Sequence, residues 1–382
     1  MVNARTQGCP SYVPLLVVWV VVALAGSAAA ATPTISAPTY VVSSSIDGRT
    51  LAAREADTSR PMASITKLMT VLVARDRARL DEQTVVTAQA TQVGESTLAL
   101  RAGELISVRD LIVGALVPSA NDAATALALH VGRGSLRRFV RLMNVRARAL
   151  GMTGTHYRNP HGLDEPGHVS TARDSIRLLR AALRDPVIRR FAAKPTAMLS
   201  DGRTVESTDH LIGVVAGFLG GKTGHTSAAG WSQVAAARRE GVTISAAVLG
   251  VASEAQRDAD IAALIEWGLA SYRRSRVVDP QRTYARVEVG WGLESLRLIA
   301  PRAVVRVAPT GRALRERVVA PFVVALPVRQ GQRLGELVVR DAGRIVARSP
   351  LVADRAIAAP GRIEQARFVA RRSVHHLVGL VR

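Results

Sequence analysis

The hydrophobic pattern of the chain changes near residue 275. Before this point, apolar residues recur every three or four positions in several segments, which is the spacing of amphipathic helices, and short extended runs lie between them. After it, short valine-rich runs alternate with glycine and proline turns, a pattern typical of strands. The sequence therefore predicts an α+β domain over residues 32–275, followed by a small all-β domain over residues 276–360.

Local signals place the main elements of the first domain. Two extended runs flank Asp47-Gly48, a dipeptide that favours a hairpin turn. A helix is expected to begin near Pro61, because proline suits the first turn of a helix and an apolar-rich run follows it. Further helices are expected over 107–129 with a break at "VPSAND", 135–152, 170–185 and 258–274, and two strands over 231–251.

The positive charge is concentrated at the C-terminal end of the chain. The protein carries a formal net charge of +21, and residues 273–382 contribute 22 arginines against 8 acidic residues. Residues 361–382 place their apolar side chains mainly on one helical face, although Arg367 intrudes on it. The pattern predicts an amphipathic tail that lies on an anionic membrane surface without crossing the bilayer. Packing of the tail on the β-rich domain is the alternative.

The N-terminus has the layout of a secretory signal peptide. Arg5 precedes the apolar run of residues 14–26, and small residues follow in an A-x-A pattern at Ala28 and Ala30. We therefore expect residues 1–31 to be a signal peptide and the protein to be exported, to the periplasm or another extracytoplasmic space, with an uncleaved anchor as the alternative. The only cysteine, Cys9, would leave with the peptide. Export and an aromatic content of 4% argue against a nucleic-acid partner.

Three short motifs carry candidate chemistry. The chain contains only three lysines, and "SITK" places Lys67 one helical turn after Ser64, close enough for the amine to activate the hydroxyl. "SAN" supplies Ser119 and Asn121, and "KTG" supplies Lys222, Thr223 and Gly224. Each motif is common by itself. Their joint occurrence in this order is the pattern of penicillin-binding proteins and class A β-lactamases.

The chain resembles the D-alanyl-D-alanine carboxypeptidases, the low-molecular-mass penicillin-binding proteins. The resembling stretches are "RPMASITKLMT", "PSANDAATALA", "MTGTHYRNPHGLDEPGH", "STARD" and "KTGHT". The resemblance implies a serine peptidase that removes the terminal D-alanine from peptidoglycan stem peptides through an acyl-enzyme, with β-lactams as covalent inhibitors. The stretch between the first two motifs, which includes "TQVGESTLALRAGE", is short for the family and puts fine substrate preference in doubt.

The chemistry assigns each motif residue an expected role. Ser64 is the nucleophile and Lys67 its base, since no histidine lies in a motif that pairs it with Ser64, and Lys222 is the cation that helps Lys67 to lose its proton. Ser119 can relay a proton, and Asn121 can hold the substrate amide and orient Lys67. A capping role for Ser119 and a turn role for Asn121 are the structural alternatives.

The resemblance supplies the remaining site residues. It implies that the backbone amides of Ser64 and His225 form the oxyanion hole, although His225 could be a solvated loop residue. Thr223 and, by resemblance, Arg257 would receive the substrate carboxylate. His161 and Asp164 are expected to be loop structure. The sequence predicts no metal site and no cofactor, because no closely spaced set of histidine, cysteine and carboxylate residues in it suggests a metal.

Other functions share parts of this pattern. A class A-like β-lactamase would need a deacylating glutamate in a Glu-x-x-x-Asn setting, whereas Glu165 is followed four positions later by Val169. A D,D-endopeptidase that cuts cross-links would use the same acyl chemistry. A penicillin-recognising scaffold with an inactive site is the alternative outside enzymes, but all the motif residues are present.

Overall fold

The computed structural model describes residues 15–22, 31–291, 293–311, 313–363 and 365. It divides into two compact units, and the chain passes from one to the other between Tyr272 and Arg273. The mixed unit is Ala30–Tyr272, and the β unit is Met1–Ala29 together with Arg273–Arg382. This division lies within strand β11 (Tyr272–Val278), close to the change of pattern near residue 275.

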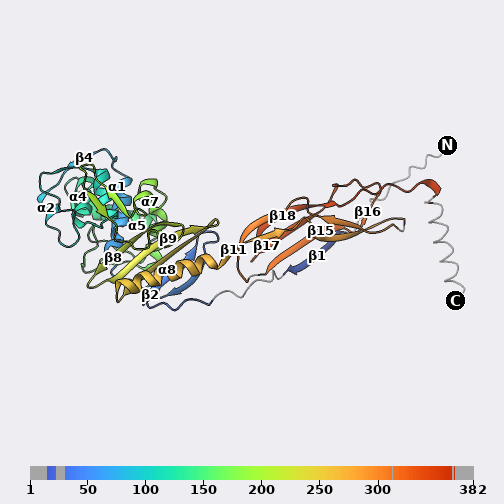
Figure 1. Ribbon diagram of the computed structural model, residues 1–382, viewed down its shortest axis with the longest axis horizontal. Helices are drawn as coiled ribbons and strands as arrows, with labels where there is room; N and C mark the ends of the chain where they lie inside the picture. The colour runs from blue at the N-terminus through green and yellow to red at the C-terminus, as the bar shows by residue number, and fades with distance from the viewer. Residues whose placement is uncertain (1–14, 23–30, 292, 312, 364, 366–382) are drawn as a thin grey trace, which may run out of the picture. The chain divides into compact units, whose positions relative to one another are not determined.

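The mixed unit contains helices and strands, as an α+β domain should (Figure 1). Its helices are η1 (Ala63–Ile65, a 3-10 turn), α1 (Thr66–Arg75), α2 (Ala88–Thr91), α3 (Val108–Leu116), α4 (Asn121–Val131), α5 (Leu136–Ala149), α6 (Ala172–Ala182), α7 (Pro186–Phe191) and α8 (Glu254–Ala270). Its strands are β2 (Thr39–Ser44), β3 (Thr50–Arg54), β4 (Gln83–Val85), β5 (Leu105–Ser107), β6 (Thr196–Met198), β7 (Thr204–Glu206), β8 (Phe218–Thr226), β9 (Gly230–Arg239) and β10 (Val242–Val251).

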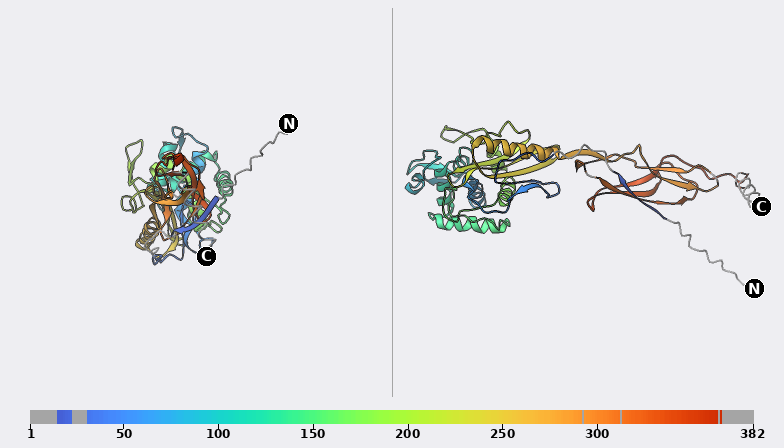
Figure 2. Two further views of the ribbon diagram at one scale, coloured as in Figure 1. Left: turned by 90° about the vertical axis from the view of Figure 1, so that its right-hand side faces the viewer. Right: turned by 90° about the horizontal axis from the view of Figure 1, so that it is seen from below.

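Five of these strands form the central antiparallel sheet, in the order β3-β2-β10-β9-β8. Neighbouring residues of β10 point to opposite faces of this sheet. Ile244 of β10 contacts Gly268 of α8, whereas Ser245 receives a hydrogen bond from Arg180 of α6, so the two helices cover opposite faces. Figures 1 and 2 show α8 running along the sheet. The arrangement leaves β8 as an edge strand, whose outer side is free to line a site.

Helix α1 is the centre of the helical part. Every residue from Thr66 to Ala74 is buried, because α3, α4, α5 and α6 pack around the helix. A helix that is buried on all sides is normally apolar. Lys67 is therefore unusual, since its side chain is fully buried in the first turn.

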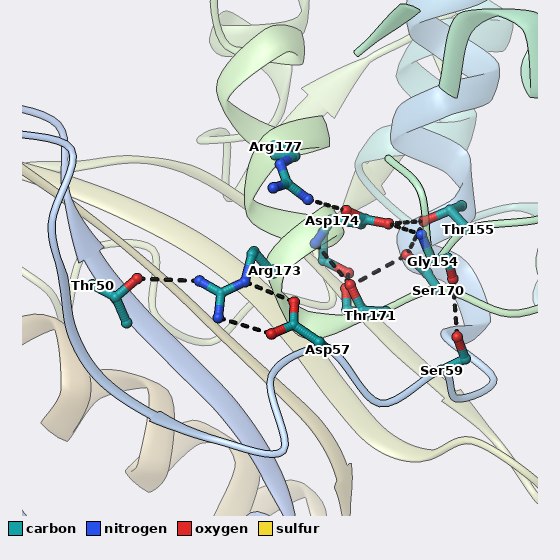
Figure 3. Close-up of polar contacts among 11 residues, drawn as sticks. Thr50, Asp57, Ser59, Gly154, Thr155, Ser170, Thr171, Arg173, Asp174 and Arg177 are labelled. Atoms are coloured by element: carbon teal, nitrogen blue, oxygen red, sulfur yellow. Dashed lines mark hydrogen bonds and ion pairs between the residues drawn. The ribbon is translucent and has the colours of Figure 1, made fainter. Parts of the chain in front are cut away.

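Polar contacts fix the N-terminus of α6 (Figure 3). Thr171 caps the helix by accepting a hydrogen bond from the backbone nitrogen of Asp174 at 3.0 Å. The buried Asp174 carboxylate accepts hydrogen bonds from Gly154 N at 2.9 Å and Thr155 Oγ1 at 2.8 Å, and it also pairs with Arg177. The "STARD" stretch therefore ties α6 to the turn at residues 154–155.

The Asp174→Asn variant should lower the free energy of unfolding by about 1–3 kcal/mol, because an amide cannot satisfy all the buried donors that the carboxylate satisfies. Urea unfolding of the full chain measures the change. Asp57→Asn is the matched control, since Asp57 forms an ion pair with Arg173 in the same region but its side chain is 72% exposed. Its expected cost is about 0–1 kcal/mol. An equal cost for both variants would contradict the importance assigned to Asp174.

Strands are the main elements among the described residues of the β unit, as the valine-rich pattern predicts. A seven-stranded sheet runs in the order β1-β15-β17-β18-β13-β12-β16, and β11 pairs with β14. Its strands are β1 (Leu15–Val22), β12 (Thr283–Val289), β13 (Leu296–Ile299), β14 (Val304–Pro309), β15 (Leu314–Pro321), β16 (Val323–Val324), β17 (Arg333–Asp341) and β18 (Arg344–Ala353). The core consists mainly of valine, leucine and alanine side chains.

Two expectations concern the ends of the chain. Residues 15–22 of the apolar run form β1, which pairs with β15, and removal of residues 1–31 as a signal peptide stays a prediction. The amphipathic helix expected over residues 361–382 lies almost entirely outside the described residues. Among the residues that the structure does describe, no helix combines the length and apolar character needed to cross a membrane.

Candidate active site

The candidate nucleophile lies in a tight turn before α1. The helix expected from Pro61 begins instead with η1, and Ser64 is the middle residue of this turn. Ala63 has a φ of 48°, in the left-handed region that non-glycine residues rarely adopt. Two glycines from distant segments pack against this turn: a Cβ on Gly162 would meet Ala63 O at 2.0 Å, and one on Gly224 would meet Ser64 N at 2.9 Å. The surrounding chain therefore holds the strained turn in place.

Lys67 is in hydrogen-bond contact with the nucleophile. Its Nζ lies 2.6 Å from Ser64 Oγ and donates to the backbone carbonyl of His161 at 3.0 Å. Burial lowers the pKa of Lys67 well below its ordinary value, and the nearby positive charge of Lys222 lowers it further. A buried amine with a depressed pKa can accept a proton from the serine hydroxyl near neutral pH.

The second motif occupies the connection between α3 and α4. Ser119 is buried, has a φ of 65° and lines the same cleft as Ser64. Asn121 is the first residue of α4, and its side-chain amide donates to Gly94 O at 2.9 Å. Asn121 was expected to orient Lys67, but its described side-chain hydrogen bond is to Gly94. The described backbone partner of Lys67 Nζ is the carbonyl of His161.

The third motif lies within edge strand β8. Lys222 is buried and donates to Thr223 O at 3.0 Å, and burial lowers the pKa of Lys222 to about 7. Thr223 Oγ1 lies 2.6 Å from Thr208 Oγ1. Gly224 follows, at the point where β8 approaches the backbone of Ser64. A larger residue at position 224 would push the strand away from the nucleophile.

The far end of the cleft is built around Trp231 of β9. The His225 ring stacks on Trp231 with ring centroids 4.2 Å apart, and the Arg257 guanidinium lies 5.3 Å from the centre of the Trp231 ring. Arg257 is buried and forms ion pairs with Glu254 and Asp258. His225 therefore lies in strand β8 and stacks on the wall of the cleft, although its side chain is exposed.

The loop of residues 159–168 joins these parts. Expected only as loop structure, it also contacts the reactive groups: His161 supplies the carbonyl acceptor for Lys67, and Asp164 Oδ1 accepts from Thr226 Oγ1 at 2.6 Å. Burial and the neighbouring Lys67 charge lower the pKa of His161 to about 3, so its ring is neutral near pH 7. Glu165 is exposed and accepts a hydrogen bond from Asn159.

One cleft is lined by residues from all three motifs. Lys67 and Lys222 are buried and are not among its lining residues. Its lining residues are Ser64, Glu95, Ser96, Ser119, Asn121, Thr208, Thr223, Gly224, His225, Trp231, Glu254 and Arg257. Sequence reasoning missed Glu95, Ser96, Thr208, Trp231 and Glu254. Trp231 could have been found from the sequence. It is one of few aromatic residues in the chain, and it directly follows the turn after "KTGHT", so the strand that carries it runs back alongside this motif.

A serine hydroxyl that is hydrogen-bonded to a buried amine is typical of enzymes that form an acyl intermediate on serine. The family model for D-alanyl-D-alanine carboxypeptidase, peptidase S11, matches residues 26–253. This chain belongs to that family, and it is a serine peptidase of the low-molecular-mass penicillin-binding type.

Individual relatives agree with this assignment. The chain is 36% identical over 242 residues to the D-alanyl-D-alanine carboxypeptidase DacB2 of Mycobacterium tuberculosis, covering 61% of this chain and 82% of that protein. It is 30% identical over 338 residues to DacA of Escherichia coli, covering 84% and 83%. The crystal structure of penicillin-binding protein 5 from Haemophilus influenzae superposes with a TM-score of 0.63 at 26% identity, covering 86% of this chain and 99% of that one.

Proposed function

We propose that this protein removes the C-terminal D-alanine from peptidoglycan pentapeptide stems through an acyl-enzyme on Ser64, and that β-lactams acylate the same serine. The observation that carries the proposal is the 2.6 Å contact between Ser64 Oγ and the buried Lys67 amine. No other side chain that could act as a base has a described hydrogen bond to Ser64 Oγ.

In the proposed first step, Ser64 Oγ attacks the carbonyl carbon of the penultimate D-alanine and its proton passes to Lys67 Nζ. The backbone N–H groups of Ser64 and His225 would stabilise the oxyanion. Collapse of this intermediate breaks the peptide bond, and Ser119 relays a proton to the departing amine of D-alanine. Water then attacks the ester and gives a proton to Lys67. The bond between Ser64 Oγ and the acyl carbon breaks, Lys67 returns the proton to Ser64 Oγ, and the shortened stem leaves.

The lining of the cleft offers two groups that could receive the substrate carboxylate. Thr223 offers a hydroxyl, and Arg257 offers a buried positive charge within the same lining. Arg257 is already paired with two carboxylates, so we assign it placement of Trp231 in addition to any direct contact with the substrate carboxylate.

Mass spectrometry of purified muropeptides after incubation with the protein tests the proposal. Loss of one alanine from pentapeptide stems is the expected result. Conversion of cross-linked dimers to monomers without that loss would instead establish the D,D-endopeptidase alternative. The β-lactamase alternative finds little support, because the exposed Glu165 does not line the cleft.

We further propose that the protein is exported and that residues 361–382 hold it at the surface of the cytoplasmic membrane. Arg367, Arg371, Arg372 and Arg382 lie in this segment, and each basic residue near anionic lipid contributes about 1 kcal/mol. Truncation after Pro360 should release the enzyme from anionic vesicles while its activity on a soluble D-Ala-D-Ala peptide stays nearly unchanged.

Vesicle sedimentation at low and high salt measures the release, since salt screens this attraction. The full chain on zwitterionic vesicles is the control. Sedimentation of the truncated form with anionic vesicles would show that the arginine-rich β unit is the anchor. Unfolding after truncation would show that the tail belongs to the fold.

A further inference from the structure

A buried carboxylate lies beside the third motif. Asp209 precedes β8 and is only 8% exposed. Its Oδ1 accepts hydrogen bonds from Gln233 Nε2 at 2.8 Å and from Leu211 N at 3.1 Å. Its Oδ2 is buried and has no hydrogen-bond partner among the described residues. An ionised oxygen in such a place is costly unless a positive charge lies close to it.

The carboxylate rests on the strand that carries Lys222. A Cβ built on Gly221 would lie 2.7 Å from Asp209 Oδ2, so the missing side chain makes room for the oxygen. Gln233, which holds the other oxygen, pairs with Thr223 across β8 and β9. Asp209 is thus held against Gly221, the neighbour of Lys222 in β8, and by the side chain of Gln233.

The charges around this carboxylate come from several elements. Lys222 of β8 and Arg257 of α8 both act to lower the pKa of Asp209, but burial raises it overall. Arg257 is already neutralised by Glu254 and Asp258, and His210 also pairs with Asp258. Of the two cations that act on Asp209, Lys222 is therefore the one that has no described ion pair with another carboxylate. In return, Asp209 is the only described group whose charge acts to raise the pKa of Lys222.

We propose that Asp209 is a positioning residue that keeps the proton on Lys222, and that Lys222 in this charged form keeps Lys67 free of its proton. The inference deepens the proposed function, because it explains how two buried lysines of one site can hold different protonation states. A charged Lys222 disfavours a second positive charge on Lys67, while Asp209 supplies the opposite charge that Lys222 requires.

The sign of the effect on pH dependence follows from these couplings. Without the Asp209 charge, Lys222 should release its proton at lower pH. Once Lys222 is neutral, Lys67 should hold its own proton to higher pH. Acylation needs a neutral Lys67 and a charged Lys222, so the alkaline limb of its pH profile, which Lys222 sets, should move to lower pH. The acid limb, which Lys67 sets while Lys222 is still charged, should stay in place.

Lysine NMR tests the charge transfer directly. The full chain, labelled with ¹³C,¹⁵N-lysine, has only three lysine signals, and the exposed Lys194 is an internal reference. In Asp209→Asn, which preserves shape and removes charge, the Lys222 titration should move down by about 1 unit or more. Asp201→Asn is the matched control, because Asp201 lies in the same part of the chain but pairs with Arg203 away from the lysines.

A charge swap separates charge from structure. In the double variant Asp209→Asn with Gln233→Glu, the amide and the carboxylate exchange places across the same hydrogen bond. The Lys222 titration should return toward its native position. An unmoved titration in Asp209→Asn, or a shift in Asp209→Asn that the swap fails to reverse, would overturn the inference.

The pH profile of acylation by fluorescent penicillin gives the second measurement. Asp209→Asn should narrow the active pH range from the alkaline side and leave the acid limb in place, whereas a purely structural defect would lower the rate by the same factor at every pH. Failure of the native chain to become acylated would contradict the proposed function, and the lysine titration would still decide the present inference. Superimposable profiles for the two forms would contradict the inference alone.

Discussion

The Ser64→Ala variant should take no covalent label from fluorescent penicillin. Its fold should be unchanged, because Ser64 is held in its turn by backbone contacts with Gly162 and Gly224 and not by its hydroxyl. The loss should be complete, since the variant has no oxygen to form the ester. Gel fluorescence measures the label, and circular dichroism confirms the fold.

Ser59→Ala is the matched control for this experiment. Ser59 lies five positions earlier and bonds to Gly154 O, outside the cleft, so its loss should leave labelling unchanged. Peptide mapping of the native protein should place the adduct on the peptide that contains Ser64. An adduct on a different peptide, or labelling that persists in Ser64→Ala, would refute the assignment of the nucleophile.

The Lys67→Arg variant should acylate about 100- to 10,000-fold more slowly, which is the usual contribution of general-base catalysis. Arginine keeps the positive charge but does not give up its proton in proteins. Stopped-flow measurement of penicillin acylation gives the rate. The Lys194→Arg variant is the control, since Lys194 is exposed and lies outside the cleft.

The pH dependence of the native enzyme checks the same role. Because the pKa of Lys67 is lowered, its neutral form persists to lower pH than that of an ordinary lysine, and acylation should decline as the pH falls through that depressed value. The acid limb should vanish in Lys67→Arg, which has no group to titrate there. A near-normal rate in this variant would mean that another group takes the serine proton.

Residue types and their spacing selected five candidate residues that lie close together in the structure, and their catalytic roles stay predictions. Ser64, Lys67, Ser119, Asn121 and Lys222 could be selected because their residue types and spacing are informative, and the structure places all five at or behind one cleft. The α+β pattern, the β-rich second unit and the hairpin at Asp47-Gly48 were also predicted correctly.

Features made by the backbone were not predictable in the same way. The carbonyl that accepts from Lys67 belongs to His161, and a carbonyl leaves no mark in residue identity. The start of α8 was placed four residues late, although Ser253 gives a capping signal by accepting from Gln256 N. Asp209 was passed over because its meaning depends on Gly221 and Gln233, which only the fold brings to it.

The hydrogen bond from Lys67 to the His161 carbonyl joins residues 94 positions apart, and this separation has a consequence for folding. In an unfolded chain Lys67 is a solvated, protonated amine and Ser64 an ordinary hydroxyl. Reactivity arises only when the loop of residues 159–168 and strand β8 have closed over the first turn of α1. During refolding, acquisition of penicillin reactivity should therefore lag behind recovery of helical structure, which makes the antibiotic a reporter of completed tertiary assembly.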